Sequence, residues 1–146
     1  YYEGSVWTYA GNYDIALPCA TQNEIDGDAA KRLVAQGVKV VSEGANMPSN
    51  IDAINVYKEN GILYGPAKAA NAGGVAVSAL EMSQNSQRLS WTREEVDGRL
   101  KDIMTNIFNT AKTTAETYGL GKDYLSGANI AAFENVANAM IAQGLV

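Results

Sequence analysis

The sequence predicts an α/β fold in which three parallel strands alternate with helices, followed by C-terminal helices. Three short apolar runs, each followed by apolar residues at helical spacing, alternate between residues 13 and 86. Beyond residue 90 the pattern is purely helical. Strands that alternate with helices of this length are joined by right-handed crossovers, which make the sheet parallel. The 146 residues, 47% of them hydrophobic, suffice for the core of one domain.

The first unit consists of the strand "YDIALPCA", residues 13–20, and a helix over residues 26–37. Asp26 is of a residue type that favours the N-cap position, and Gly37 is typical of a helix C-terminus. Leu33 lies on the apolar side of this helix. The order is therefore strand, loop and helix.

The second unit repeats this order with the strand "VKVVSE", residues 38–43, and a helix that ends at Gly61. Ser49 and Asp52 have the spacing of a capping box, with Asp in the place of the usual Glu. We therefore expect Ser49 to cap this helix. The third strand is "ILYG", residues 62–65.

The segment "GPAKAANAGGVAVSALEMSQNS", residues 65–86, is predicted to form a helix that begins at the carboxyl edge of the sheet. One stripe of this helix combines an amide, apolar side chains and a hydroxyl: Asn71, Val75, Ser78 and Met82. Of these we expect Met82 to belong to the core. Free N–H groups at residues 72–75 favour an anionic ligand. Close packing of a neighbouring element is the alternative, because small residues also allow it: Gly73, Gly74, Ala76 and Ala79.

Two helices are expected after residue 90. Thr92 and Glu95 form a capping box, and apolar residues then recur at steps of three or four until Gly119. Residues 120–129, "LGKDYLSGAN", are predicted to be a linker. The last helix is expected to be amphipathic and carries these apolar residues: Ile130, Phe133, Val136, Ala137, Met140 and Ile141.

The loops that follow the strands contain the candidate binding residues. Ligands of open parallel sheets bind beyond the carboxyl ends of the strands, which here gives the loops 19–23, 44–48 and 65–74. Small residues let a ligand approach the backbone, while amides such as Asn46 and Asn71 both donate and accept hydrogen bonds. This combination suits a carboxamide or a ribose. Ordinary turn chemistry is the alternative for any single loop.

Composition and charge exclude several classes of function. The net charge is −5 and the basic residues are scattered, which argues against nucleic acid as a partner. Apolar runs are too short for a membrane span, so we expect a cytoplasmic protein without membrane contact. With no His and with Cys19 as the single cysteine, we expect no metal site. No phosphate-binding motif of the type G-x-G-x-x-G or G-x-x-x-x-G-K-[ST] is found.

Four segments carry a resemblance to a known family: "DIALPCATQNEID", "EGANMPSN", "GPAKAANAGGVAVSALEMSQNS" and "SGANIAAFENVANAMIAQG". Together they resemble the C-terminal part of the hexameric NAD(P)-dependent glutamate dehydrogenases, over residues 13–146. The resemblance implies reversible oxidative deamination of L-glutamate to 2-oxoglutarate and ammonia, with NADP or NAD as cofactor. It also implies a homo-oligomer, which in this family is a hexamer.

The resemblance also implies roles for individual residues. Ser78 would donate a hydrogen bond to the side-chain carboxylate of glutamate, and Val75 would line the pocket beside its aliphatic part. Asn71 would lie where substrate and nicotinamide meet, and so belongs to both sites. The positions near the nicotinamide ribose and carboxamide are Ala20, Thr21 and Asn46.

The domain organisation implied is the second half of a Rossmann-like doubly wound domain, residues 1–90, and a helical segment, residues 91–146, that packs back toward a substrate domain. In the family, the catalytic lysines and aspartate lie in that N-terminal domain. No catalytic residue is therefore expected in this chain, which we predict to be an inactive fragment on its own. A non-catalytic nucleotide-binding module and a self-associating interaction module are the alternatives.

Overall fold

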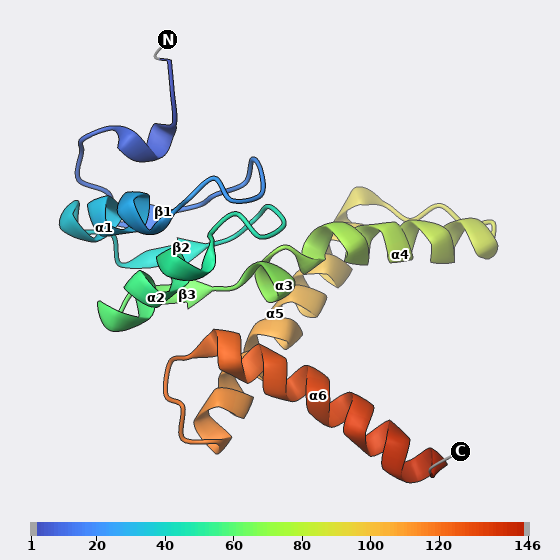
Figure 1. The fold of residues 1–146 in the computed structure, drawn as a ribbon. Helices are drawn as coiled ribbons and strands as arrows, with labels where there is room; N and C mark the ends of the chain where they lie inside the picture. The colour runs from blue at the N-terminus through green and yellow to red at the C-terminus, as the bar shows by residue number, and fades with distance from the viewer. Residues whose placement is uncertain (1–2, 145–146) are drawn as a thin grey trace.

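The computed structural model describes residues 3–144 and confirms the predicted α/β fold with three parallel strands. The predicted domain ranges extend beyond it at residues 1–2 and 145–146. Strands β1 (Ile15–Ala16), β2 (Val40–Ser42) and β3 (Leu63–Gly65) form one sheet in this order (Figure 1). Strand β1 is shorter than the predicted run 13–20, since Pro18 has no N–H to give to a ladder.

Helices α1 (Gly27–Ala35) and α2 (Ile51–Glu59) pack against each other and enclose the main core with the sheet. Asp26 caps α1 as predicted, because its carboxylate accepts from the N–H of Ala29 at 2.8 Å. The predicted cap of α2 is wrong by one residue. Asn50, rather than Ser49, accepts from the N–H of Ala53 at 2.9 Å. Ser49 is buried instead.

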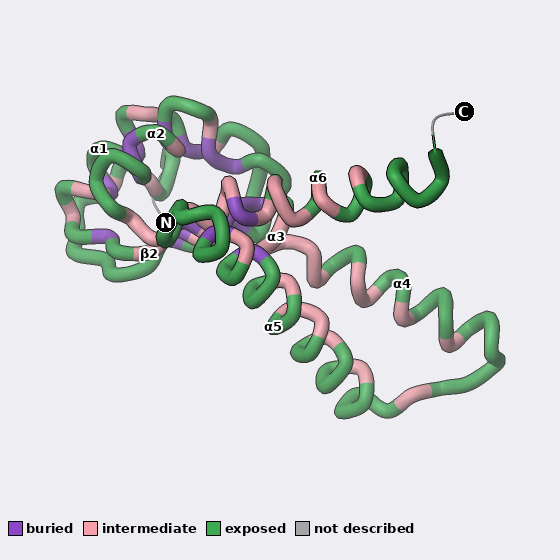
Figure 2. Tube along the Cα trace, turned by 90° about the horizontal axis from the view of Figure 1, so that it is seen from below, coloured by how far each residue is buried: buried purple, intermediate pink, exposed green. Residues whose placement is uncertain are grey.

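The glycine-rich segment is divided into α3 (Ala67–Ala70) and α4 (Ala72–Ser86), which meet at Asn71. Helix α4 extends away from the sheet and is covered on one side by α5 (Figures 1 and 2). A Cβ at Gly73 would lie 3.5 Å from side-chain atoms of Leu100 and Met104. Gly73 thus lies against α5, but an added Cβ would be in ordinary van der Waals contact there, so this packing does not require a glycine. The expectation of a core position for Met82 is wrong, because its side chain is 70% exposed.

Helices α5 (Arg93–Thr117) and α6 (Tyr124–Gln143) form the C-terminal part, and a 3-10 turn, η1 (Val6–Thr8), precedes β1. The capping box predicted for α5 is confirmed: the amide of Thr92 donates to Glu95 at 2.7 Å and the amide of Glu95 to the Thr92 hydroxyl at 3.2 Å. Within residues 3–144, no helix combines the length and the apolar character that crossing a membrane requires.

The predicted linker 120–129 is wrong in its second half, because α6 already begins at Tyr124. Asp123 caps this helix by accepting from the N–H of Ser126 at 3.0 Å, and it forms an ion pair with Lys58 of α2 at 2.8 Å. Partial burial raises the pKa of Asp123, but the hydrogen bonds from Lys58 and Ser126 outweigh it and lower the pKa below its usual value. The ion pair therefore fastens the start of α6 to the α/β part.

A buried carboxylate joins the ends of strands β2 and β3. Glu43, which follows β2 directly, is only 2% exposed. It accepts hydrogen bonds from the amide of Ser49 at 3.1 Å, the hydroxyl of Tyr64 at 2.7 Å and the amide of Ala67 at 2.8 Å. These donors belong to the next loop, the next strand and the next helix. One side chain thus fixes how three consecutive segments leave the sheet.

Tyr57 and Tyr64 lie beside the Glu43 carboxylate in the core. The centroids of their rings are 5.5 Å apart, and the hydroxyl of Tyr57 is 3.2 Å from that of Ser49. Burial raises the pKa of Tyr57 to about 12, and burial together with the bond to Glu43 raises the pKa of Tyr64 as well. Both tyrosines therefore remain neutral at physiological pH, so that Tyr64 can donate to Glu43.

We expect Gly127→Ala to destabilise the fold by about 2 kcal/mol, the range of an overpacked core. A Cβ there would collide with the carbonyl oxygen of Ala111 and approach the Cβ of Ala115 to 3.0 Å, where α6 crosses α5. Urea unfolding measures the difference. The matched control is Gly98→Ala within α5, where nothing lies within 4 Å, and it should stabilise the protein by up to about 1 kcal/mol. Equal effects of both substitutions would contradict the close contact between α5 and α6 at Gly127.

We expect Glu43→Gln to lower the free energy of unfolding by about 2 to 3 kcal/mol. One carboxylate oxygen becomes an NH2 group, which would face a backbone N–H that has lost its acceptor. The same urea titration applies. As a control, Glu59→Gln makes the identical change at an exposed position of α2 and should remain within about 0.5 kcal/mol. A stability loss no larger than that of the control would show that Glu43 does not hold the segments.

Candidate functional site

The loops after β1 and β2 are joined at the carboxyl edge of the sheet. The carbonyl of Pro18 accepts from the amides of Gly44 at 2.9 Å and Ala45 at 3.2 Å. Further along, the amide of Asn23 donates to the carbonyl of Met47 at 2.9 Å. Asn23 and Met47 both have positive φ angles, 56° and 53°, so both loops turn sharply where they touch.

The segment after β3 reaches the same edge through one side chain. Asn71 is half-buried, and its Nδ2 donates to the carbonyl of Ala45 at 3.0 Å. No described residue donates to its Oδ1, which leaves this atom as an acceptor. The three predicted loops are therefore bonded to one another within the chain.

The candidate cofactor residues lie along this edge. Ala20, Thr21 and Asn46 are exposed, and Asn71 lies beside the residue that precedes Asn46. A hydroxyl, amides and small side chains thus lie along one edge of the sheet. Their donors and acceptors can satisfy a carboxamide or a ribose hydroxyl.

The candidate substrate residues Val75 and Ser78 lie one and two turns along α4 from Asn71, at a rise of about 1.5 Å per residue. Both are exposed, and Val75 is 70% exposed. The Ser78 hydroxyl donates to the carbonyl of Gly74 at 3.3 Å, a weak bond within its own helix. It can therefore turn toward a ligand at small cost.

Helix α4 begins beside the same edge without a side-chain cap. Its N-cap residue is Asn71, whose side chain bonds to Ala45 rather than to the first turn of the helix. The N–H groups predicted to be free at residues 72–75 thus belong to the first turn of α4, but that of Gly74 donates to the carbonyl of Asn71 at 3.4 Å. Lys68 is exposed and does not point to this edge, because its ammonium donates to Asn129 of α6 at 2.5 Å.

Sequence reasoning missed two residues that hold these loops, Glu24 and Glu43. Glu24 reaches back to the amide of Thr21, and Thr21-Gln22-Asn23-Glu24 has the T-x-x-E spacing of a capping box, a signal that could have identified it. The signal for Glu43 is weaker. It consists of a carboxylate directly after a strand of consecutive valines.

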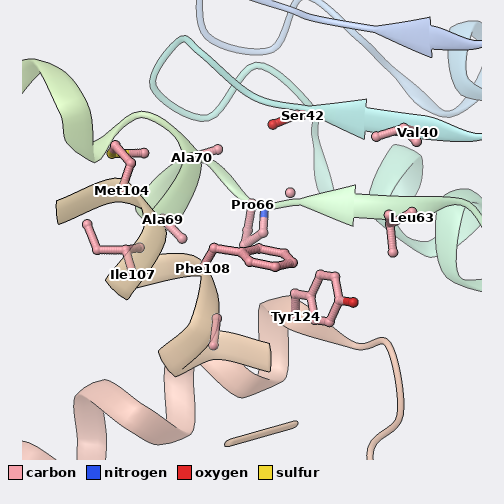
Figure 3. A pocket seen from close by; sticks show the side chains of 12 residues that line it. Val40, Ser42, Leu63, Pro66, Ala69, Ala70, Met104, Ile107, Phe108 and Tyr124 are labelled. Atoms are coloured by element: carbon pink, nitrogen blue, oxygen red, sulfur yellow. The ribbon is translucent and has the colours of Figure 1, made fainter. Parts of the chain in front are cut away.

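A separate cavity of about 290 Å³ lies between the sheet and the C-terminal helices (Figure 3). Side chains alternate along a strand, so Val40, Ser42 and Leu63 face this cavity while Val41 and Tyr64 face the main core. The other wall is apolar and comes from α5 and α6, with Ile107, Phe108 and Tyr124 among its residues. None of the six candidate site residues lines it.

Metal ligands do not gather anywhere in residues 3–144: no group of three His, Cys, Asp or Glu side chains could hold an ion there. The candidate site at the carboxyl edge is therefore built from amides, a hydroxyl and small residues. It can bind and orient a ligand through hydrogen bonds. Its two carboxylates are engaged within the chain: Glu43 is buried and accepts three hydrogen bonds, and Glu24 accepts from Ala20, Thr21 and Trp7.

Comparison with known proteins gives strong similarity to one group of enzymes. The NADP-specific glutamate dehydrogenase of Giardia intestinalis is 58% identical over 148 residues, which cover 100% of this chain and 33% of that protein. The NADP-specific glutamate dehydrogenase of Escherichia coli (strain K12) is 56% identical over 91% of this chain and 30% of its own length. This chain spans about a third of the length of the curated relatives that it matches.

Solved structures and a sequence family agree with these relatives. The crystal structure of Plasmodium falciparum glutamate dehydrogenase superimposes with a TM-score of 0.87 and 55% identity, over 91% of this chain and 29% of that one. The sequence profile of the Glutamate/Leucine/Phenylalanine/Valine dehydrogenase family matches residues 1–144. The chain therefore belongs to the Glutamate/Leucine/Phenylalanine/Valine dehydrogenase family.

Proposed function

We propose that this chain is the C-terminal third of a cytoplasmic, homohexameric NADP-dependent glutamate dehydrogenase. The reaction is the reversible oxidative deamination of L-glutamate to 2-oxoglutarate and ammonia. The observation that carries the proposal is the gathering of Ala20, Thr21, Asn46 and Asn71 at one sheet edge, where α4 begins. The 58% identity to an NADP-specific enzyme supports NADP rather than NAD as the cofactor.

The exposed groups of the sheet edge fit the nicotinamide end of this cofactor. Thr21 and Asn46 present a hydroxyl and an amide to solvent, and the Oδ1 of Asn71 can accept a hydrogen bond from a carboxamide. The cofactor supplies the acceptor for the hydride from glutamate. The chain contains no glycine-rich turn for the pyrophosphate, so we assign that contact, and the catalytic lysines and aspartate, to the remaining part of the protein.

Residues of α4 bind the substrate in this proposal. Ser78 turns from the Gly74 carbonyl and donates to the side-chain carboxylate of glutamate, while Val75 contacts its methylene groups. Because both residues are exposed in this chain, a second wall is needed to exclude water from the substrate. The substrate domain provides this wall. In the whole protein, residues 1–90 form half of the cofactor domain, and residues 91–146 pack toward the substrate domain.

We expect the 146-residue chain to be inactive alone and active in a chimera in which it replaces the matching third of the Giardia intestinalis enzyme. Oxidation of NADPH in the presence of 2-oxoglutarate and ammonium, followed by absorbance, measures both. Turnover by the isolated chain would contradict the assignment of the catalytic residues to the remaining part of the protein. A folded chimera that binds NADPH without turnover would favour a non-catalytic nucleotide-binding module instead.

In the chimera, we expect Ser78→Ala to lower kcat/KM for glutamate by about one to two orders of magnitude, since a hydrogen bond to a charged group is lost. The KM for NADP should change by less than about threefold. Ser83→Ala is the matched control, because Ser83 makes the same type of bond within α4, to Ala79 at 2.8 Å, and is also exposed. A kcat/KM no lower than that of the control would exclude Ser78 from the pocket.

A further inference from the structure

Glu24 uses both of its carboxylate oxygens to bind parts of the chain that lie on either side of β1. Its Oε1 accepts from the amides of Ala20 at 2.9 Å and Thr21 at 3.2 Å. Its Oε2 accepts from the indole N–H of Trp7 at 2.9 Å. Hydrogen bonds to a carboxylate are stronger than those between neutral groups, so each of these contacts restrains the loop.

The loop around Thr21 has few other restraints. Its beginning is fixed where the Pro18 carbonyl accepts from the second loop, and its end where the amides of Asn23 and Ile25 donate to Met47 at 2.9 Å and to Pro48 at 3.0 Å. Between these points, Ala20 and Thr21 are exposed, and Glu24 is the hydrogen-bond acceptor that the structure gives their amides. Removing this carboxylate would free both amides.

Trp7 gives Glu24 a fixed partner. The indole belongs to η1 and packs against the main core, and this packing holds its N–H in place. An indole has one donor and two rotatable side-chain bonds, which makes it a rigid anchor. The position of Glu24, and through it the loop backbone, is therefore tied to the core.

We propose that Glu24, held by Trp7, is a positioning residue that sets the backbone of Ala20 and Thr21 for the nicotinamide end of the cofactor; this inference rests on the proposed function. The two amides are used internally by Glu24. The loop therefore offers the Thr21 hydroxyl to the cofactor, rather than its N–H groups. Glu24 itself does not touch the substrate or cofactor.

The test uses the chimera with the Giardia intestinalis enzyme. Glu24→Ala should raise the KM for NADPH about tenfold, while the KM for 2-oxoglutarate changes by less than about twofold, because only the cofactor loop loses its restraint. Glu24→Gln should have a smaller effect, since its amide oxygen can still accept from both N–H groups. Trp7→Phe should raise the KM for NADPH about threefold, and should add nothing in the Glu24→Ala background.

Asp28→Asn is the matched control, because it removes a nearby carboxylate whose one partner among the described residues is Lys31, at 3.2 Å on the surface. It should leave both KM values unchanged. Hydrogen exchange of the amides of residues 20 and 21 provides a readout independent of activity, and Glu24→Ala should accelerate it about tenfold or more. If the unsubstituted chimera is inactive, the proposed function fails, while the exchange rates still decide whether Glu24 holds the loop. Unchanged exchange, or a parallel rise of both KM values, would overturn the inference.

Discussion

The arrangement of the carboxyl edge depends on a buried carboxylate that has no cationic partner among residues 3–144. Glu43 lies at the end of the central strand and is satisfied only by donors from the chain that follows it: Ser49, Tyr64 and Ala67. Placing a carboxylate in an apolar core is costly unless all its bonds are made, so the three segments can adopt few other arrangements. The candidate residues Asn46 and Asn71 lie on the segments that Glu43 restrains. The edge that carries the candidate residues is thus held by bonds within the chain itself.

The chain combines this rigid edge with helices that bury little of their own surface. The main core lies between the sheet, α1 and α2, whereas most of α4 and α6 is exposed (Figure 2). Large apolar side chains are exposed on both helices, Val75 and Met82 on α4 and Phe133 and Ile141 on α6. In the proposed enzyme, α4 forms one wall of the substrate cleft. Binding of the cofactor and binding of the substrate would then use two different parts of this chain, joined at Asn71.

The sequence was sufficient for those features that depend on local chemistry and on periodicity. Alternation of strands and helices, the Asp26 cap and the Thr92 capping box all arise from residues close together in the chain. Features decided by tertiary contacts were missed: Asn50 displaces Ser49 as a cap because Ser49 is drawn into the bonds of Glu43 and Tyr57. Likewise, a pattern of apolar residues on α4 and α6 predicts a buried face, but it does not say which part of a protein covers that face. The roles of the six site residues stay predictions, since they concern ligands.

The most direct test of this account is a crystal structure of the chimera with NADP and glutamate bound. We expect the nicotinamide end to contact Thr21, Asn46 and Asn71, and the glutamate side chain to receive a hydrogen bond from Ser78. The Glu43 bonds should be the same as in the chain described here, because they are made within the chain itself. A cofactor bound away from this edge, or a Ser78 hydroxyl covered by the protein's own side chains, would contradict the account.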